Sequence, residues 1–88
     1  MIELKDTVTM MLSDDYKKRF IAEYCQLKIR YKKLYAVLEK HAADKLDFKL
    51  SCPDEILYQQ LDHMEAYLKV MKVRAGYENI VLPNEAEF

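Results

Sequence analysis

Hydrophobic residues recur every three or four positions through a long central stretch, from Ser13 to Lys40, that contains neither Gly nor Pro. This spacing lays one apolar stripe along an α-helix of about 3.6 residues per turn. The stripe consists of Phe20, Tyr24, Leu27, Tyr31, Leu34 and Leu38. Ser13 can cap the first turn, where Asp14 and Asp15 complement the helix dipole. The pattern predicts a helix over residues 14–40.

A second stretch with the same spacing follows a short connector. Ser51 can cap it, Pro53 is tolerated in a first helical turn, and Gly76 stands where a left-handed C-cap belongs. Its apolar positions are Leu57, Leu61, Met64, Leu68, Met71 and Ala75. We therefore expect a second helix over residues 52–75 and a connector over residues 41–51.

The two ends of the chain carry weaker patterns. Residues 1–12 suit a short helix or a docked arm, and the tail, residues 76–88, holds one apolar triplet before Pro83. Two long helices joined by a short connector form an antiparallel hairpin. The chain is thus expected to be one all-α domain, residues 1–88.

Further apolar and aromatic residues lie beside the two stripes. Left exposed, they would form patches larger than a soluble monomer usually tolerates, and 88 residues is near the lower limit for a single stable core. Self-association into a dimer or a higher closed oligomer is therefore expected. These flanking residues are Ile21, Ile29, Tyr35, Val37, Ile56, Tyr58, Tyr67, Val70 and Val73.

Charge is distributed unevenly along the chain. The net charge is −1, yet between Lys17 and Lys33 seven basic residues are opposed only by Glu23. Such a concentration is typical of a local site for an anion, although a solvated helix that happens to be basic gives the same pattern. The first long helix thus combines a packing stripe with an anion-attracting surface.

The residue types present argue against several functional classes of protein. Cys25 and Cys52 are too few for a disulfide framework and lack metal-ligand spacing, so reduced thiols and no metal or cofactor are expected. His41 and His63 lie on different elements without catalytic partners, so no enzymatic activity is expected. No signal peptide and no apolar run of membrane-spanning length is seen, which predicts a cytoplasmic protein without a membrane partner.

Candidate ligand-binding residues lie one position away from the stripes. Aromatic rings and guanidinium groups placed together can stack on a base and pair with a phosphate. Ordinary rim packing in a helical oligomer, with Arg19 and Glu23 as an i,i+4 ion pair, would also explain them. Duplex nucleic acid is not expected, because the pI is about 6.1 and no helix-turn-helix turn is present. The residues are Tyr16, Arg19, Glu23, Gln26, Arg30 and Lys33, with Gln60, Tyr67 and Arg74 on the second helix.

These positions resemble a family of small phage proteins, the anti-CBASS sponges, which sequester cyclic oligonucleotides and are related to a domain of crAss-like phages. The likeness covers about residues 14–78. It rests on Tyr16-x-x-Arg19, Glu23-x-x-x-Leu27 and Leu34, followed by Leu57, Gln60-x-x-x-Met64-x-x-Tyr67 and Arg74.

The resemblance implies a non-catalytic hexamer of helical hairpins that evades host defence in the host cytoplasm. Cyclic dinucleotides such as cyclic GMP-AMP would bind between two protomers, at Tyr16 with Arg30 or Lys33, and Arg19 would face the same junction. Cyclic trinucleotides would occupy separate sites where three protomers meet, lined by Arg74. The family tends to carry Lys near position 30, where this chain has Arg30, so the basic partner stays open. The alternative function is an oligomeric helical adaptor that binds a protein or nucleic acid through its basic helix.

Overall fold

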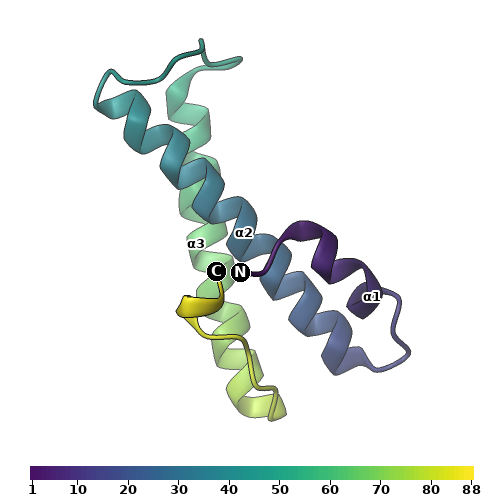
Figure 1. Ribbon diagram of the computed structural model, residues 1–88. Coiled ribbons are helices and arrows are strands. Elements are labelled where there is room, and N and C mark those ends of the chain that lie inside the picture. The colour runs from purple at the N-terminus through teal and green to yellow at the C-terminus, as the bar shows by residue number, and fades with distance from the viewer.

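The computed structural model describes residues 1–88, and every regular element in it is helical. The all-α class expected from the hydrophobic pattern is therefore confirmed. In chain order the elements are η1 (Leu4–Thr7), α1 (Val8–Met11), α2 (Tyr16–Ala42), α3 (Asp54–Glu78) and η2 (Glu85–Glu87). Figure 1 shows the two long helices side by side toward the connector and diverging toward their other ends, with α1 beside the first half of α2 and both chain ends near the middle.

The two long helices form an antiparallel hairpin whose core lies in the half away from the connector. Phe20 and Tyr24 of α2 are buried against Leu68, Met71 and Ala75 of α3, as their places in the two stripes predict. Toward the connector Leu38 is buried, but the other stripe residues, Leu34, Leu57, Leu61 and Met64, are only partly buried. The radius of gyration, 14.8 Å, exceeds the roughly 12 Å of a compact domain of this length. The chain is thus an elongated rod with a small core.

The N-terminal segment covers a second face of α2. Elements η1 and α1 both pack against that helix, and Thr7 accepts a hydrogen bond from Gln26 Nε2 at 3.0 Å. On this half of α2, Ala22, Cys25 and Ile29 are buried although they lie outside the predicted stripe. The expectation that Ile29 adds to open apolar surface is therefore wrong, because the chain covers it with its own N-terminus.

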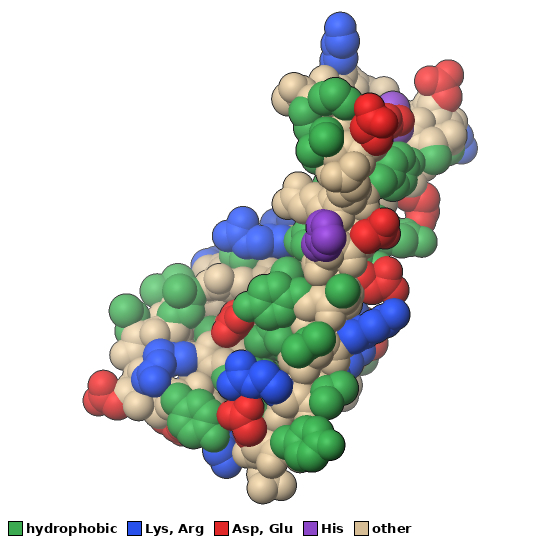
Figure 2. Space-filling model, turned by 180° about the vertical axis from the view of Figure 1, so that it is seen from behind, with side chains coloured by type: hydrophobic (Ala, Val, Ile, Leu, Met, Phe, Trp, Pro, Cys, Tyr) green, Lys and Arg blue, Asp and Glu red, His purple; other side chains and the backbone are tan.

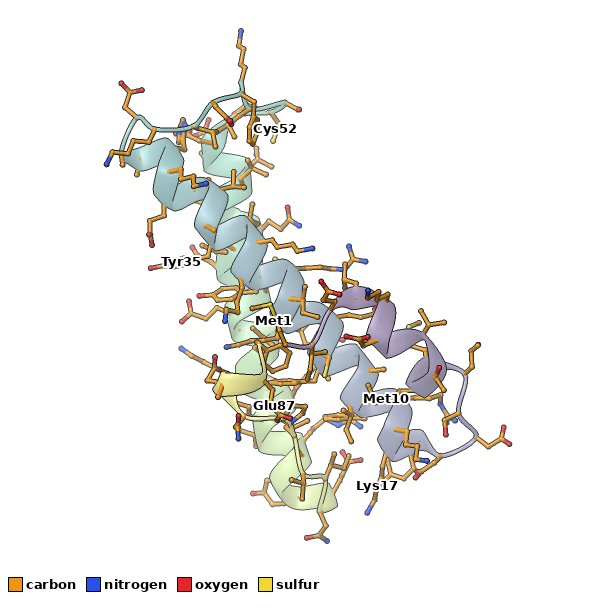
Figure 3. All side chains as sticks on the ribbon, viewed as in Figure 1. Met1, Met10, Lys17, Tyr35, Cys52 and Glu87 are labelled. Carbon is orange, nitrogen blue, oxygen red and sulfur yellow. The ribbon has the colours of Figure 1, made fainter.

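The C-terminal tail folds back onto the hairpin. Ile80 is buried in the core, and the Phe88 ring meets the edge of Tyr24 with 6.1 Å between ring centroids. The backbone N–H of Ile2 donates to the carbonyl of Glu87 at 2.7 Å, which joins the two ends of the chain. Figure 3 shows Met1 and Glu87 close together across the middle of the molecule.

The first long helix begins and ends two residues later than predicted. Asp15 is the N-cap of α2 and accepts a hydrogen bond from the Lys17 N–H at 2.9 Å. Ser13, the expected cap, instead accepts from the Asp15 N–H at 3.1 Å and so shapes the turn before the helix. The helix then continues to Ala42.

The second long helix also lies further along the chain than predicted. It begins at Asp54 after Pro53, without the expected cap from Ser51, and it runs through Gly76 to Glu78. Asn79 adopts the left-handed conformation, with φ 56°, that Gly76 was expected to take. Asn tolerates this conformation better than most residues, which explains the later end. The extension places Glu78 one turn after Arg74.

Candidate functional site

An aromatic and charged cluster lies where the N-terminal end of α2 meets the C-terminal end of α3. Tyr16, the first residue of α2, is 48% exposed. From α3, the Arg74 guanidinium lies 4.7 Å from the centroid of the Phe20 ring, close enough for a cation–π contact. Arg74 Nε also donates to Glu78 Oε2 at 2.7 Å. The cluster therefore offers an exposed ring and a cation held in a fixed place.

Electrostatics keep the two charges of this cluster ionised. The hydrogen bond from Arg74 is the main cause that lowers the pKa of Glu78, with smaller contributions from the Tyr16 hydroxyl and Lys17. The same bond raises the pKa of Arg74. An incoming phosphate would therefore compete with Glu78 for a permanent cation. Tyr16 and Arg74 thus both act on the charge of one carboxylate, although they are distant in the sequence.

A second contact joins the two helices beside this cluster. The Tyr67 hydroxyl of α3 donates to Glu23 Oε2 of α2, so two residues singled out beside the stripes face each other. The Tyr67 ring remains 47% exposed. Figure 2, seen from the side on which α3 lies in front, shows apolar side chains interspersed with acidic and basic ones on this face.

Arg19 does not form the i,i+4 ion pair with Glu23 that the alternative of ordinary rim packing includes. Its Nη1 donates to the backbone carbonyl of Ser13 at 2.7 Å, while Glu23 accepts from Tyr67. Arg19 therefore holds the turn that precedes α2, and its side chain stays exposed near the start of that helix.

Arg30 and Lys33 lie far from Tyr16 within one chain. Fourteen residues separate Tyr16 from Arg30 on the same helix, which corresponds to roughly 21 Å along the axis. Both basic residues are exposed, and neither forms an ion pair. A site that combines Tyr16 with either of them needs a second protomer.

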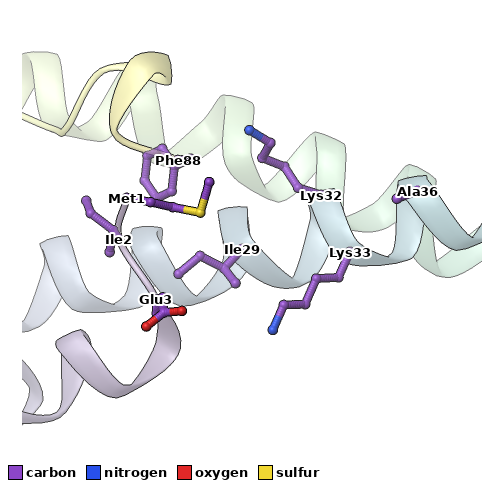
Figure 4. A pocket seen from close by; sticks show the side chains of 8 residues that line it. All are labelled: Met1, Ile2, Glu3, Ile29, Lys32, Lys33, Ala36 and Phe88. Atoms are coloured by element: carbon purple, nitrogen blue, oxygen red, sulfur yellow. The ribbon is translucent and has the colours of Figure 1, made fainter.

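A cavity of about 300 Å³, which the two ends of the chain form on α2, could not be predicted from the sequence. Figure 4 shows apolar side chains around it, with Lys32 and Lys33 extending along its side. Residues from both termini contribute, so no local spacing could have revealed it. The lining consists of Met1, Ile2, Glu3, Ile29, Lys32, Lys33, Ala36 and Phe88.

Glu78 is the other site residue that the sequence reasoning missed. Its i,i+4 spacing from Arg74 is visible in the sequence, but the expected helix end at Gly76 placed Glu78 in the tail.

No helix combines the length and apolarity needed to cross a membrane. No group of three His, Cys, Asp or Glu side chains is placed to hold a metal ion.

A family model matches most of the chain. The model of the family described as Sequestin matches residues 14–77, which include the whole of α2 and nearly all of α3. No curated protein and no solved structure matches the chain. The family match spans well over half of the residues and contains the Tyr16, Glu23, Tyr67 and Arg74 positions. The chain therefore belongs to the Sequestin family, the phage anti-CBASS cyclic-nucleotide sponges.

Proposed function

We propose that this protein binds cyclic dinucleotides such as cyclic GMP-AMP in the host cytoplasm and withholds them from a host CBASS effector without degrading them. Family membership supports this function. The observation that carries it is the exposed ring of Tyr16 at the junction of α2 and α3, beside the contact between Arg74 and the buried Phe20 ring. Sequestration needs only tight binding and abundance, so no catalytic group is required.

The chemistry of the ligand matches what two copies of the chain offer. A cyclic dinucleotide has two phosphates and two bases, and each protomer supplies an exposed Tyr16 ring for stacking. Arg30 or Lys33 of a second protomer would pair with the phosphates, since both are free of ion pairs. A two-fold junction would match the near two-fold symmetry of the ligand. Arg19 would border the same junction.

We extend the proposal to cyclic trinucleotides and to a hexamer. Arg74 from three copies would surround a trinucleotide, as the resemblance implies. The accessible surface of the chain is 6448 Å², against roughly 5,400 Å² for a compact monomer of this mass. Exposed apolar side chains on α3, among them Val70 and Val73, supply area that an oligomer would cover.

Calorimetric titration with cyclic GMP-AMP tests the function. We expect saturable binding, and intact nucleotide should be recovered after the protein is digested with a protease. Recovery of a linear product would indicate a nuclease instead. Absence of any binding would favour the adaptor function of the basic helix.

Two substitutions assign the ligand-binding residues. Tyr16→Ala should weaken dinucleotide binding about tenfold or more, because stacking on one base contributes roughly 1–3 kcal/mol. Tyr58→Ala is the matched control, since Tyr58 is also a partly exposed ring but lies near the connector. Arg74→Ala should lower trinucleotide affinity and spare dinucleotides. Equal loss of both ligands would instead indicate one shared pocket around Glu78.

A further inference from the structure

Lys28 of α2 is an unusual lysine, because its side chain is only 12% exposed. Lysine is rarely buried without a partner. The partner is Glu85 of η2, whose Oε1 lies 2.5 Å from Lys28 Nζ. Lys28 is also the main cause that lowers the pKa of Glu85, and the charges of Lys72 and Lys32 add to it. Three lysines thus surround one carboxylate that belongs to the tail.

A cavity of about 310 Å³ opens beside this ion pair. Its walls are Lys28, Tyr31, Lys32, Tyr35 and Glu85. The rings of Tyr31 and Tyr35 are 6.1 Å apart, and Lys28 Nζ lies 6.0 Å from the centroid of Tyr31. Figure 3 shows Tyr35 on the connector side of Met1 and Glu87.

The walls of this cavity have the chemistry that a nucleotide requires. Ammonium groups attract a phosphate, and tyrosine rings provide faces on which a base can stack. The volume lies at the small end of the usual range for ligand sites, roughly 300–1,000 Å³, and suits one nucleotide unit. The carboxylate of Glu85 occupies the place next to Lys28 that a phosphate would take.

We propose that this cavity is a further phosphate-and-base binding site and that Glu85 acts as an internal competitor for its anion position. The inference takes its ligand class from the proposed function, but it concerns different residues from Tyr16 and Arg74. Glu85 lies beyond the segment matched by the family, residues 14–77, so the competitor belongs to this chain's own tail.

The tail is built so that Glu85 can be displaced while the core stays intact. The Glu85 side chain is 63% exposed, so its carboxylate can leave Lys28 for solvent without any core residue moving. Ile80, at the start of the tail, is buried and holds the tail to the core without Glu85. A ligand that binds only when Glu85 has left is weakened by the fraction of time that the carboxylate occupies the site.

Titration with AMP, which carries one base and one phosphate, tests the proposal on the full chain. We expect Glu85→Gln to bind AMP about tenfold more tightly than the unmodified protein, because the competitor charge is gone. Glu85→Asp keeps the charge and should stay close to the unmodified protein. Glu55→Gln, a change of the same kind at an exposed position of α3, should have no effect.

A second variant tests whether Lys28 is the cation that binds the phosphate of AMP. Lys28→Met keeps most of the aliphatic length of the side chain and should abolish the gain when combined with Glu85→Gln. Circular dichroism of each variant verifies that the helices remain. Unchanged or weaker AMP binding by folded Glu85→Gln would overturn the proposal, as would a gain that persists without Lys28.

The same variants separate this inference from the proposed function. If cyclic GMP-AMP binds the unmodified protein through Tyr16 and Glu85→Gln leaves AMP binding unchanged, only the inference fails. If AMP binding rises in Glu85→Gln but cyclic GMP-AMP binds no variant, the proposed function fails and the cavity stands.

Discussion

Thr7 is the one polar residue whose side chain is fully buried, with 0% exposed. Its hydroxyl donates to the Leu4 carbonyl at 2.7 Å and accepts from Gln26 Nε2. Thr7→Val keeps the shape but removes both hydrogen bonds of the hydroxyl, so we expect the free energy of unfolding to fall by about 1–3 kcal/mol. Thermal unfolding followed by circular dichroism should show a midpoint lowered by at least about 4 °C.

Thr7→Ser is the control for the hydroxyl. It retains both hydrogen bonds and removes one methyl group, so its midpoint should fall less than that of Thr7→Val. A valine variant as stable as the unmodified protein would show that water satisfies Gln26 and Leu4.

A second prediction for single residues concerns the Lys28–Glu85 pair and pH. Because the folded pKa of Glu85 is lowered, the pair stabilises the chain above the ordinary pKa of glutamate, and this stabilisation is lost as the pH falls through the folded value. Glu85 is largely exposed, so the effect should be less than about 1 kcal/mol. Between pH 6 and pH 3 the unfolding midpoint of the unmodified protein should therefore fall slightly more than that of Glu85→Gln. A larger fall in Glu85→Gln would contradict this sign.

The core residues that could be predicted from the sequence are those that belong to an apolar pattern repeated every three or four positions. Phe20, Tyr24 and Leu68 were placed in the core because helical periodicity is visible over a few turns. Thr7 and Lys28 were missed because each finds its partner in a distant part of the chain. The pairing of Tyr67 with Glu23 was likewise not predicted, although both residues were singled out.

At the scale of elements, α2 carries two buried faces, and the N-terminal segment provides the cover for the second. Cys25 lies on that face with 0% exposed, and burial raises the pKa of its thiol. Cys52, in the connector, is partly exposed. Ellman's reagent should therefore modify one thiol at once and Cys25 at least about 100-fold more slowly, because Cys25 needs local opening.

Thr7→Val tests whether the N-terminal segment protects Cys25 from modification. Weakening the contact between η1 and α2 should accelerate modification of Cys25 and leave Cys52 unchanged, as peptide mass mapping can show. Equal rates for both thiols in the unmodified protein would mean that the N-terminal segment does not protect α2.

Helix boundaries were harder to predict than the helices themselves. The apolar stripe of α3 ends near Ala75, but the helix continues to Glu78 because Asn79 can take the left-handed turn in place of Gly76. This difference of one turn decides the electrostatics of the cluster, since it gives Arg74 its helical partner. The terminal cavity could not be predicted at all, because it depends on how two ends without strong patterns dock.

At the scale of the whole molecule, an apolar stripe on the outer side of α3 predicts how copies associate. Ala66, Val70, Val73 and Tyr77 recur at helical spacing and are exposed. Val73 is 60% exposed and Tyr77 is 85% exposed, so neither contributes much to the core of one chain. We expect the unmodified protein to scatter light as a multiple of its 10.5 kDa mass.

Val73→Glu would place a charge in the middle of this stripe. Burying an unpaired carboxylate between copies is costly, so the variant should shift toward 10.5 kDa while its helical content is retained. Lys49→Glu, which changes charge at an exposed position of the connector, away from this stripe, should leave the mass unchanged. Loss of cyclic GMP-AMP binding together with loss of the oligomer would tie the ligand site to the junction between protomers. A clean monomer of the unmodified protein would contradict both the hexamer and the shared site, because Tyr16 cannot reach Arg30 or Lys33 within one chain.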